Sequence, residues 1–122
     1  MSGNKYLADT NAFIYLLRKH PAIESLLSAE WSYSFITRIE LLGKPGITKA
    51  EIEMIKEMLD ACTVIQHTDE INDLTIQLKQ KYKIKTPDAI IAATGIHKNL
   101  PVLTADSGFT KIEELDIILI EL

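Results

Sequence analysis

Apolar residues recur along the chain with two different spacings. Short runs that are apolar throughout, or that alternate with polar residues, are typical of strands, and they occupy 5–8, 31–35, 63–66, 101–104 and 116–122. Apolar residues three or four positions apart are typical of amphipathic helices, and they occupy 11–18, 20–30, 37–43, a segment that opens at Thr48, a segment with Ile71, Leu74 and Leu78, and 87–97. Because strands alternate with helices, the pattern predicts an α/β fold with a largely parallel central sheet of about five strands.

Two of the helices begin with recognisable signals. Thr48 and Glu51 form a capping-box pattern at the start of one helix. Thr86 and Pro87 predict an N-cap followed by proline at the first helical position. The helix 87–97 is apolar almost all round, so we expect it to be central and buried.

The composition is that of a globular protein with a substantial core. The 122 residues fit one domain, 1–122, with 47% hydrophobic and 25% charged residues. No apolar run approaches the ~20 residues of a membrane span and no signal-peptide pattern opens the chain, so we expect a cytoplasmic protein. The single cysteine, Cys62, excludes an intrachain disulfide and suits a reducing compartment. Trp31 and Tyr33 are expected in the core rather than at a subunit interface.

Four carboxylates fall where this fold would bring them together. Asp9 follows the first strand, and Asp106 lies two residues after the fourth strand. Glu40 lies in the helix after the second strand, and Asp88 lies in the first turn of the apolar helix. Open α/β sheets form their sites outside the carboxyl ends of the strands. We therefore expect the four acids to converge on one edge of the sheet.

A cluster of carboxylates favours a bound cation. Like charges within a few ångströms repel and raise each other's pKa values, so such a cluster is stable as anions when a cation lies in it. Oxygen ligands suit hard divalent cations such as Mg²⁺ or Mn²⁺. One or two such ions can polarise a phosphodiester, position a hydroxide and stabilise the leaving oxygen. The three histidines show no ligand spacing and there is one cysteine, which argues against zinc.

Each acid also has a structural alternative. Asp9 could cap the helix that follows it, and Asp88 could simply complement a helix dipole. Glu40 completes a capping-box pattern with Thr37. Asp106 could form an Asx-turn. These alternatives explain least well why Asp88 enters a helix with almost no other polar face, and why Asp9 separates two apolar segments.

The same residues carry a family resemblance over nearly the whole chain. The segments LADTNAFIYLL, TRIELLG, TPDAIIAATGI and PVLTADSGF occur in this order. Together they resemble the PIN-domain ribonucleases, and most of all the VapC toxins of bacterial type II toxin–antitoxin pairs. The resemblance implies a three-layer α/β/α fold around a parallel sheet, in agreement with the fold class predicted from the pattern.

The resemblance also implies a set of site residues and partners. The metal ligands and catalytic residues would be Asp9, Glu40, Asp88 and Asp106. Thr104 would support the site from behind, and Thr10 and Asn11 would orient the first acid. The implied activity is Mg²⁺- or Mn²⁺-dependent hydrolysis of RNA that leaves a 5′-phosphate and a 3′-hydroxyl. The implied partners are an antitoxin, whose tail blocks the acidic site, and a second copy of the chain in a homodimer.

Basic residues are the candidates for holding RNA. The net charge is −4 and the pI is about 5.3, whereas proteins that coat nucleic acid passively are usually basic. An acidic enzyme would therefore hold RNA locally, with help from metal cations. The candidate contacts are Arg38, Lys44, Lys83, Lys85 and Lys111. The alternative for the run around Lys83 and Lys85 is an ordinary solvated charge run.

Three other functions compete with a toxin nuclease. The first is a PIN-fold module that binds without cutting, and the four intact acids argue against it. The second is a phosphatase with an aspartyl nucleophile, but such enzymes usually carry a second aspartate two residues later, where this chain has Asn11. The third is an RNA-processing or DNA-cleaving PIN nuclease that works without an antitoxin. A neighbouring small reading frame for a DNA-binding partner would favour the toxin.

Overall fold

The computed structural model of the chain describes residues 4–122. Five strands form one sheet in the order β3-β2-β1-β4-β5, and every neighbouring pair is parallel. The strands are β1 (Lys5–Ala8), β2 (Glu30–Ser34), β3 (Thr63–Ile65), β4 (Val102–Thr104) and β5 (Ile117–Leu119). The predicted α/β class and the parallel sheet of about five strands are confirmed.

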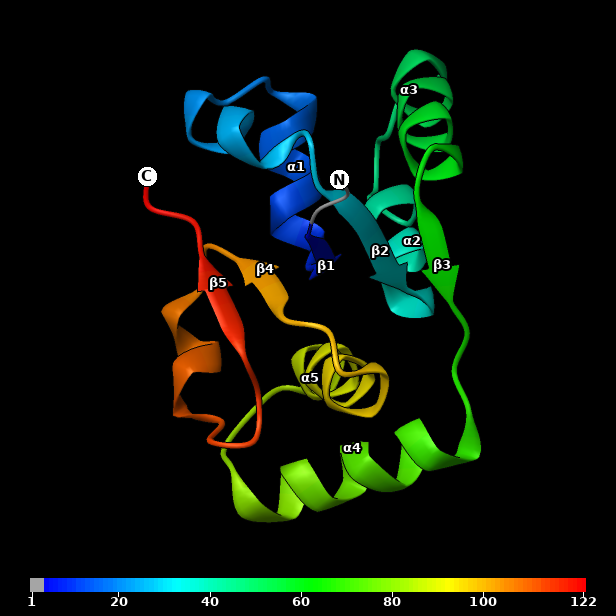
Figure 1. Cartoon of the computed structure of the whole chain (residues 1–122). Helices are drawn as coiled ribbons and strands as arrows, with labels where there is room; N and C mark the ends of the chain where they lie inside the picture. The colour runs from blue at the N-terminus through cyan, green and yellow to red at the C-terminus, as the bar shows by residue number, and fades with distance from the viewer. Residues whose placement is uncertain (1–3) are drawn as a thin grey trace.

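Helices cover both faces of the sheet, as Figure 1 shows. They are α1 (Thr10–Leu17), the 3-10 helix η1 (Pro21–Leu26), α2 (Phe35–Leu42), α3 (Lys49–Asp60), α4 (Asp69–Lys81), α5 (Thr86–Lys98) and the 3-10 helix η2 (Ser107–Lys111). α5 and α4 lie on one side of the sheet, and α1 with η1 lies on the other (Figure 1). The arrangement is the three-layer α/β/α architecture that the resemblance implied.

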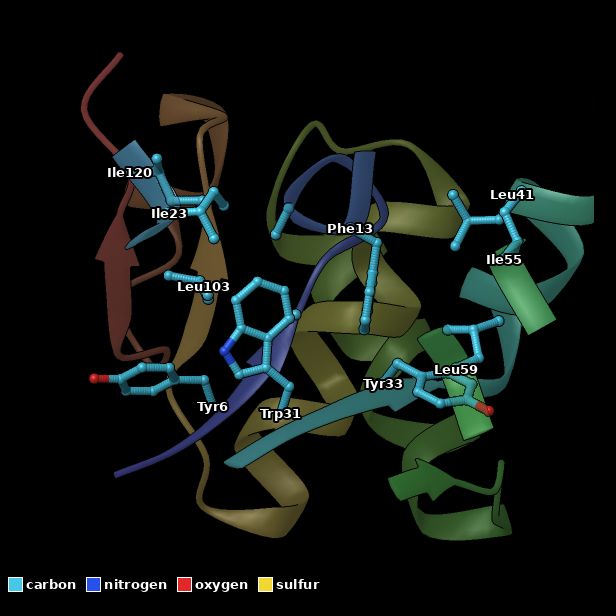
Figure 2. Packing of buried hydrophobic residues seen from close by; sticks show 12 residues of the cluster. Tyr6, Phe13, Ile23, Trp31, Tyr33, Leu41, Ile55, Leu59, Leu103 and Ile120 are labelled. Atoms are coloured by element: carbon cyan, nitrogen blue, oxygen red, sulfur yellow. The ribbon is translucent and has the colours of Figure 1, made fainter. Parts of the chain in front are cut away.

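Two hydrophobic cores follow from the alternation of side chains along the strands. Tyr6 and Ala8 of β1 point into one core, and Leu7 between them points into the other. In the first core the ring of Phe13 meets Trp31 and Tyr33 edge to face, at centroid distances of 5.4 and 5.9 Å (Figure 2). Both strand aromatics are buried, which confirms the expectation that they serve the core.

The second core is built around α5. Ala89, Ile91, Ala92 and Ala93 are buried, and the helix contacts β2 and β4 as well as α4. A helix enclosed on two sides has little room for polar residues, which explains its nearly continuous apolar sequence. The prediction that this helix is central and buried is confirmed.

Some predicted boundaries are wrong, and the chain shows why. The helix expected over 20–30 is the short η1, because the residues after it turn into β2, which begins at Glu30 and pairs with β1. The strand expected over 116–122 is paired only at Ile117–Leu119, because β4 offers three residues as partners. Within residues 4–122, no helix combines the length and the apolar character needed to cross a membrane.

The predicted cap is right for α3 and wrong for α5 and α2. The capping box of Thr48 and Glu51 is formed at the start of α3, with both bonds at 3.1 Å. In α5 the N-cap is Lys85, so Thr86 is the first helical residue. α2 begins earlier than expected, and its N-cap is Ser34.

Candidate active site

The strand order creates a switch point between β1 and β4. From β1 the chain adds β2 and β3 on one side, then crosses over to add β4 and β5 on the other side. Ligand sites in open α/β sheets lie outside the carboxyl ends of the strands at this point. Asp9 directly follows β1 and Asp106 follows β4 by two residues, so both acids flank the switch point.

A small cavity at this edge of the sheet brings the predicted acids together. Its volume is about 100 Å³. Its lining residues are Asp9, Thr10, Asn11, Glu40, Asp88, Ile91 and Asp106. Four carboxylates far apart in the sequence therefore face one space, together with two of the three residues that the resemblance suggested as supports.

Asp9 is held by partners on both of its oxygens. Its carboxylate is 4% exposed. Oδ1 accepts a hydrogen bond from the backbone N–H of Ala12 at 3.1 Å, so Asp9 is the N-cap of α1. Oδ2 accepts a hydrogen bond from the hydroxyl of Thr104. The capping role proposed as an alternative is confirmed, and the same bonds fix the direction in which this carboxylate faces the cavity.

Thr104 links two of the acids from behind the cavity. Its side chain is fully buried at the end of β4. Its hydroxyl oxygen accepts the backbone N–H of Asp106 at 2.9 Å while its single proton is donated to Asp9. Thr104 therefore couples the position of the Asp9 carboxylate to the backbone that carries Asp106.

Glu40 is oriented by threonines from two helices. The hydroxyl of Thr10 donates a hydrogen bond to Glu40 Oε1 at 2.6 Å. The hydroxyl of Thr37, on a fully buried side chain, lies 3.3 Å from that of Thr10. Since Ser34 caps α2, the capping-box explanation of Glu40 and Thr37 is wrong.

Thr37 supports Glu40 through Thr10, whereas its position in the sequence predicts a helix cap. It stands three positions before Glu40, a spacing that places both on one face of a helix. That spacing was the available signal. It was interpreted as a cap because the helix was expected to begin at Thr37 rather than at Phe35.

Asp88 and Asp106 approach the cavity from α5 and from the turn after β4. Asp88 is half-buried in the first turn of its helix. Asp106 is the N-cap of η2, and its Oδ1 accepts the N–H of Gly108 at 2.8 Å. The local turn proposed as an alternative for Asp106 is therefore present, in addition to its place at the cavity.

The electrostatics of the cavity disfavour its own negative charge. Burial raises the pKa of Asp9, and the charge of Asp106 adds to this, while the bonds from Thr104 and from backbone amides act against it. Burial also raises the pKa of Asp88, as do the charges of Asp106, Asp9 and Glu40, whereas the nearby Lys85 lowers it. The acids thus stand close enough to destabilise one another as anions.

The donor set fits a hard divalent cation. All four charged groups are carboxylates, and each ionised carboxylate has about four lone-pair positions, more than its present partners use. Within residues 4–122, no three carboxylate, imidazole or thiol groups are already gathered as closely as a closed metal cage requires. Mg²⁺ commonly binds through one or two carboxylates and keeps several waters, so a closed cage is not needed.

The basic candidates lie at different distances from the acids. Lys85 is the N-cap of α5, and Lys83 lies just before it in the connection from α4. Lys111 Nζ donates a hydrogen bond to the backbone carbonyl of Lys83 at 2.5 Å. Lys44 lines a neighbouring groove together with Glu40. Arg38 is half-buried on α2 and lines neither that groove nor the acidic cavity.

The neighbouring groove is mainly apolar and shares two lining residues with the acidic cavity. Its volume is about 270 Å³. It is lined by α1, α2, α3 and the loop between the last two, with the residues Thr10, Ile14, Leu17, Arg18, Glu40, Leu41, Lys44, Ile47, Glu51, Met54 and Ile55. Thr10 and Glu40 line both spaces, so a ligand in the groove would reach the carboxylates.

Solved structures similar to this one come from toxin–antitoxin complexes. A toxin–antitoxin complex from Klebsiella pneumoniae contains a chain with 26% identity and a TM-score of 0.81, over 95% of this chain and 98% of that one. A chain of VapBC-1 from nontypeable Haemophilus influenzae has 26% identity and a TM-score of 0.80, over 94% of this chain and 97% of that one. A chain of DNA-bound VapBC from Salmonella typhimurium has 19% identity and a TM-score of 0.83, over 95% of this chain and 98% of that one. At this identity the likeness supports the fold alone.

A family model covers most of the chain. No curated protein matches the sequence. The model of the PIN domain matches residues 6–115, a range that includes all four acids and Thr104. The chain therefore belongs to the PIN domain family, a family of nucleases.

Proposed function

We propose that residues 1–122 form a single Mg²⁺- or Mn²⁺-dependent endoribonuclease domain, the toxin of a toxin–antitoxin pair. The observation that carries this proposal is the convergence of four carboxylates on one cavity at the switch point of the sheet. The pKa values of Asp9 and Asp88 are raised, which indicates negative charge that a bound cation would stabilise. The toxin assignment is supported by the VapBC complexes among the similar structures.

The residues of the chain would bind and orient the reacting groups. A divalent ion bound by Asp9, Glu40, Asp88 and Asp106 would supply charge stabilisation for the phosphodiester and lower the pKa of water. The hydroxyls of Thr104 and Thr10 would fix the orientation of the carboxylates of Asp9 and Glu40. The proposed reaction needs no covalent protein intermediate, because a water held by the ion would attack the phosphodiester.

Substrate binding would use the cations beside the cavity. Lys85 is close enough to Asp88 for its charge to lower the pKa of that acid, so its ammonium group lies within reach of a phosphate bound at the cavity. Lys83, Lys44, Lys111 and Arg38 would hold more distant phosphates. The choice of RNA as substrate, and the cytoplasm as the compartment where it is cut, rest on the resemblance to the toxins.

We propose that the antitoxin tail binds in the apolar groove. Ile14, Leu17 and Met54 offer apolar contacts, and Met54 is 56% exposed. A basic side chain of the tail would then reach Glu40, which lines both the groove and the cavity. An antitoxin seated in this way would prevent RNA from reaching the acids.

We also propose a homodimer. Trp31 and Tyr33 are 6% and 4% exposed, so they are not available to a partner subunit. Ile39 of α2 and Ile76 of α4 are 58% and 49% exposed, which makes them the better candidates for the interface. Light scattering on the purified chain, with Ile39→Lys as the disrupting variant, would test this.

The nuclease is tested with purified protein, total RNA and Mn²⁺ or Mg²⁺. Asp88→Asn is the inactivating variant, because Asp88 lines the cavity from the first turn of α5. Asp69→Asn is its matched control, since Asp69 occupies the first turn of α4. We expect discrete cleavage by the wild type and by Asp69→Asn, and none by Asp88→Asn or in EDTA.

The outcomes separate the competing functions. Cleavage that survives both EDTA and Asp88→Asn would contradict the proposed site. A folded chain that cleaves neither RNA nor DNA with metal would indicate a PIN-fold binding module. Cleavage without any inhibitory partner encoded nearby would indicate an RNA-processing or DNA nuclease of the same family.

A further inference from the structure

Two connecting segments each deliver one acid to the cavity. The connection from α4 to α5 runs through Tyr82 and Lys85 and leads to Asp88. The segment after β4 starts at Asp106 and continues through η2 toward β5. Asp88 lies in the first turn of α5 and Asp106 caps η2, so contacts between these two segments act close to both acids along the chain.

Polar contacts join the two segments on their exposed side. The hydroxyl of Tyr82 donates to Glu114 Oε1 at 2.5 Å and accepts the backbone N–H of Glu113 at 3.1 Å. Lys81 Nζ binds the other carboxylate oxygen of Glu114 at 3.1 Å. Lys111 Nζ reaches back to the carbonyl of Lys83. We call these six residues the latch.

The contacts of the latch are mutually consistent in direction and charge. The Tyr82 hydroxyl gives its one proton to a carboxylate and uses its oxygen for an amide, so a single arrangement satisfies both. The Tyr82 bond is the main reason that the pKa of Glu114 is lowered. The bond to Glu114 raises the pKa of Lys81, as expected for an ion pair.

Apolar packing places the latch over the second core. The rings and chains of Tyr82 and Ile84 pack against the cluster that contains Phe109, Ile112 and Leu115. This packing brings the segments together but leaves sliding and rotation possible, because dispersion contacts are not directional. The hydroxyl of Tyr82 adds a fixed direction to the contact.

We propose that Tyr82 and Glu114 are positioning residues, which set the separation of Asp88 and Asp106 and thereby the affinity of the cavity for a divalent cation. The inference rests on the proposed function and adds to it a role for residues outside the cavity. It also gives Lys81, which lies beside the charge run around Lys83 and Lys85, a partner within the protein.

The test is Mn²⁺ binding by the full chain without RNA, measured by calorimetry. Tyr82→Phe keeps the packed ring and removes the hydroxyl, and Glu114→Gln removes the charge from an exposed side chain. We expect Mn²⁺ affinity to fall about three- to tenfold, less than the 10- to 100-fold typical of groups that touch a metal ligand directly. Ribonuclease kcat at saturating Mn²⁺ should return to the wild-type value, which loss of folding would not permit.

Tyr15→Phe is the matched control. Tyr15 is a half-buried tyrosine of α1 that packs against His20, away from the latch. Its Mn²⁺ affinity should equal that of the wild type. Unchanged affinity in both Tyr82→Phe and Glu114→Gln would overturn the inference and leave the nuclease standing. A wild-type chain that binds no Mn²⁺ would overturn the proposed function, and the inference with it.

Discussion

Replacing Thr104 by valine tests how the acidic cavity is held together. Valine has nearly the same shape as threonine and lacks the hydroxyl. That hydroxyl donates to Asp9 and accepts the N–H of Asp106 at 2.9 Å, on a side chain that is fully buried. The substitution therefore removes the two hydrogen bonds that join Thr104 to Asp9 and to Asp106, without opening a large cavity.

The cost can be worked from those two bonds. A hydrogen bond to a charged group contributes about 1.5–3 kcal/mol, and an unsatisfied buried amide costs about 1–3 kcal/mol. The Asp106 amide is only partly buried, so water can reach it and the lower end of its range applies. We expect Thr104→Val to lower the free energy of unfolding by about 2–4 kcal/mol at neutral pH.

The unfolding free energy lost in Thr104→Val should become smaller as the pH falls. The Thr104 bond stabilises ionised Asp9 and so lowers its pKa, against burial, which raises it. The contribution of this bond is therefore present while Asp9 is ionised and declines as pH falls through the pKa of Asp9 in the folded state. We expect the destabilisation to be smaller at pH 4.5 than at pH 7.5.

Urea unfolding followed by the fluorescence of Trp31, the single tryptophan, measures this directly. Thr104→Ser keeps the hydroxyl and is the matched control, with an expected loss below that of valine at both pH values. A loss for valine below about 0.5 kcal/mol, or one equal at pH 4.5 and 7.5, would refute the role assigned to this hydroxyl.

Three further predictions follow from the cavity and its surroundings. Without metal, Asp88→Asn should raise the midpoint of thermal unfolding, because it removes a charge that burial and three other carboxylates destabilise; Asp69→Asn should not. Met54→Asp places a charge in the apolar groove and should weaken inhibition by the cognate antitoxin, measured by titration against ribonuclease activity. Replacing Lys83 and Lys85 by glutamine should reduce the slope of log affinity for RNA against log salt by about 1.4, and an unchanged slope would exclude both contacts.

The fold was predictable where local pattern and tertiary contacts agree. The five strands lie within two residues of their predicted starts because each carries a short apolar or alternating run that is typical of strands. The pattern failed at the ends of elements, where a partner decides the length. The apolar run at the end of the chain reads as a strand of seven residues, but only Ile117–Leu119 find partners, in the short β4.

The four acids could be placed at one edge because the carboxyl ends of parallel strands meet there. The resemblance added the roles that spacing alone left open. The supporting contacts were harder to foresee. Thr37 meets Thr10 and Tyr82 meets Glu114 across 27 and 32 positions of sequence, and such contacts depend on how helices and turns dock. For Tyr82 and Glu114, no local pattern distinguishes the two residues from ordinary surface positions.

The choice of supporting groups bears on what the cavity can bind. The direct partners of the acids are mainly neutral donors: threonine hydroxyls on Asp9 and Glu40, and backbone amides on Asp9 and Asp106. Neutral donors orient a carboxylate and leave its charge in place, whereas a lysine in the same position would neutralise it. The raised pKa values of Asp9 and Asp88 show that these donors do not compensate for burial and repulsion. A fold that brings four carboxylates together while leaving their charge uncompensated gives up stability at this edge, and the proposed divalent cation would restore it.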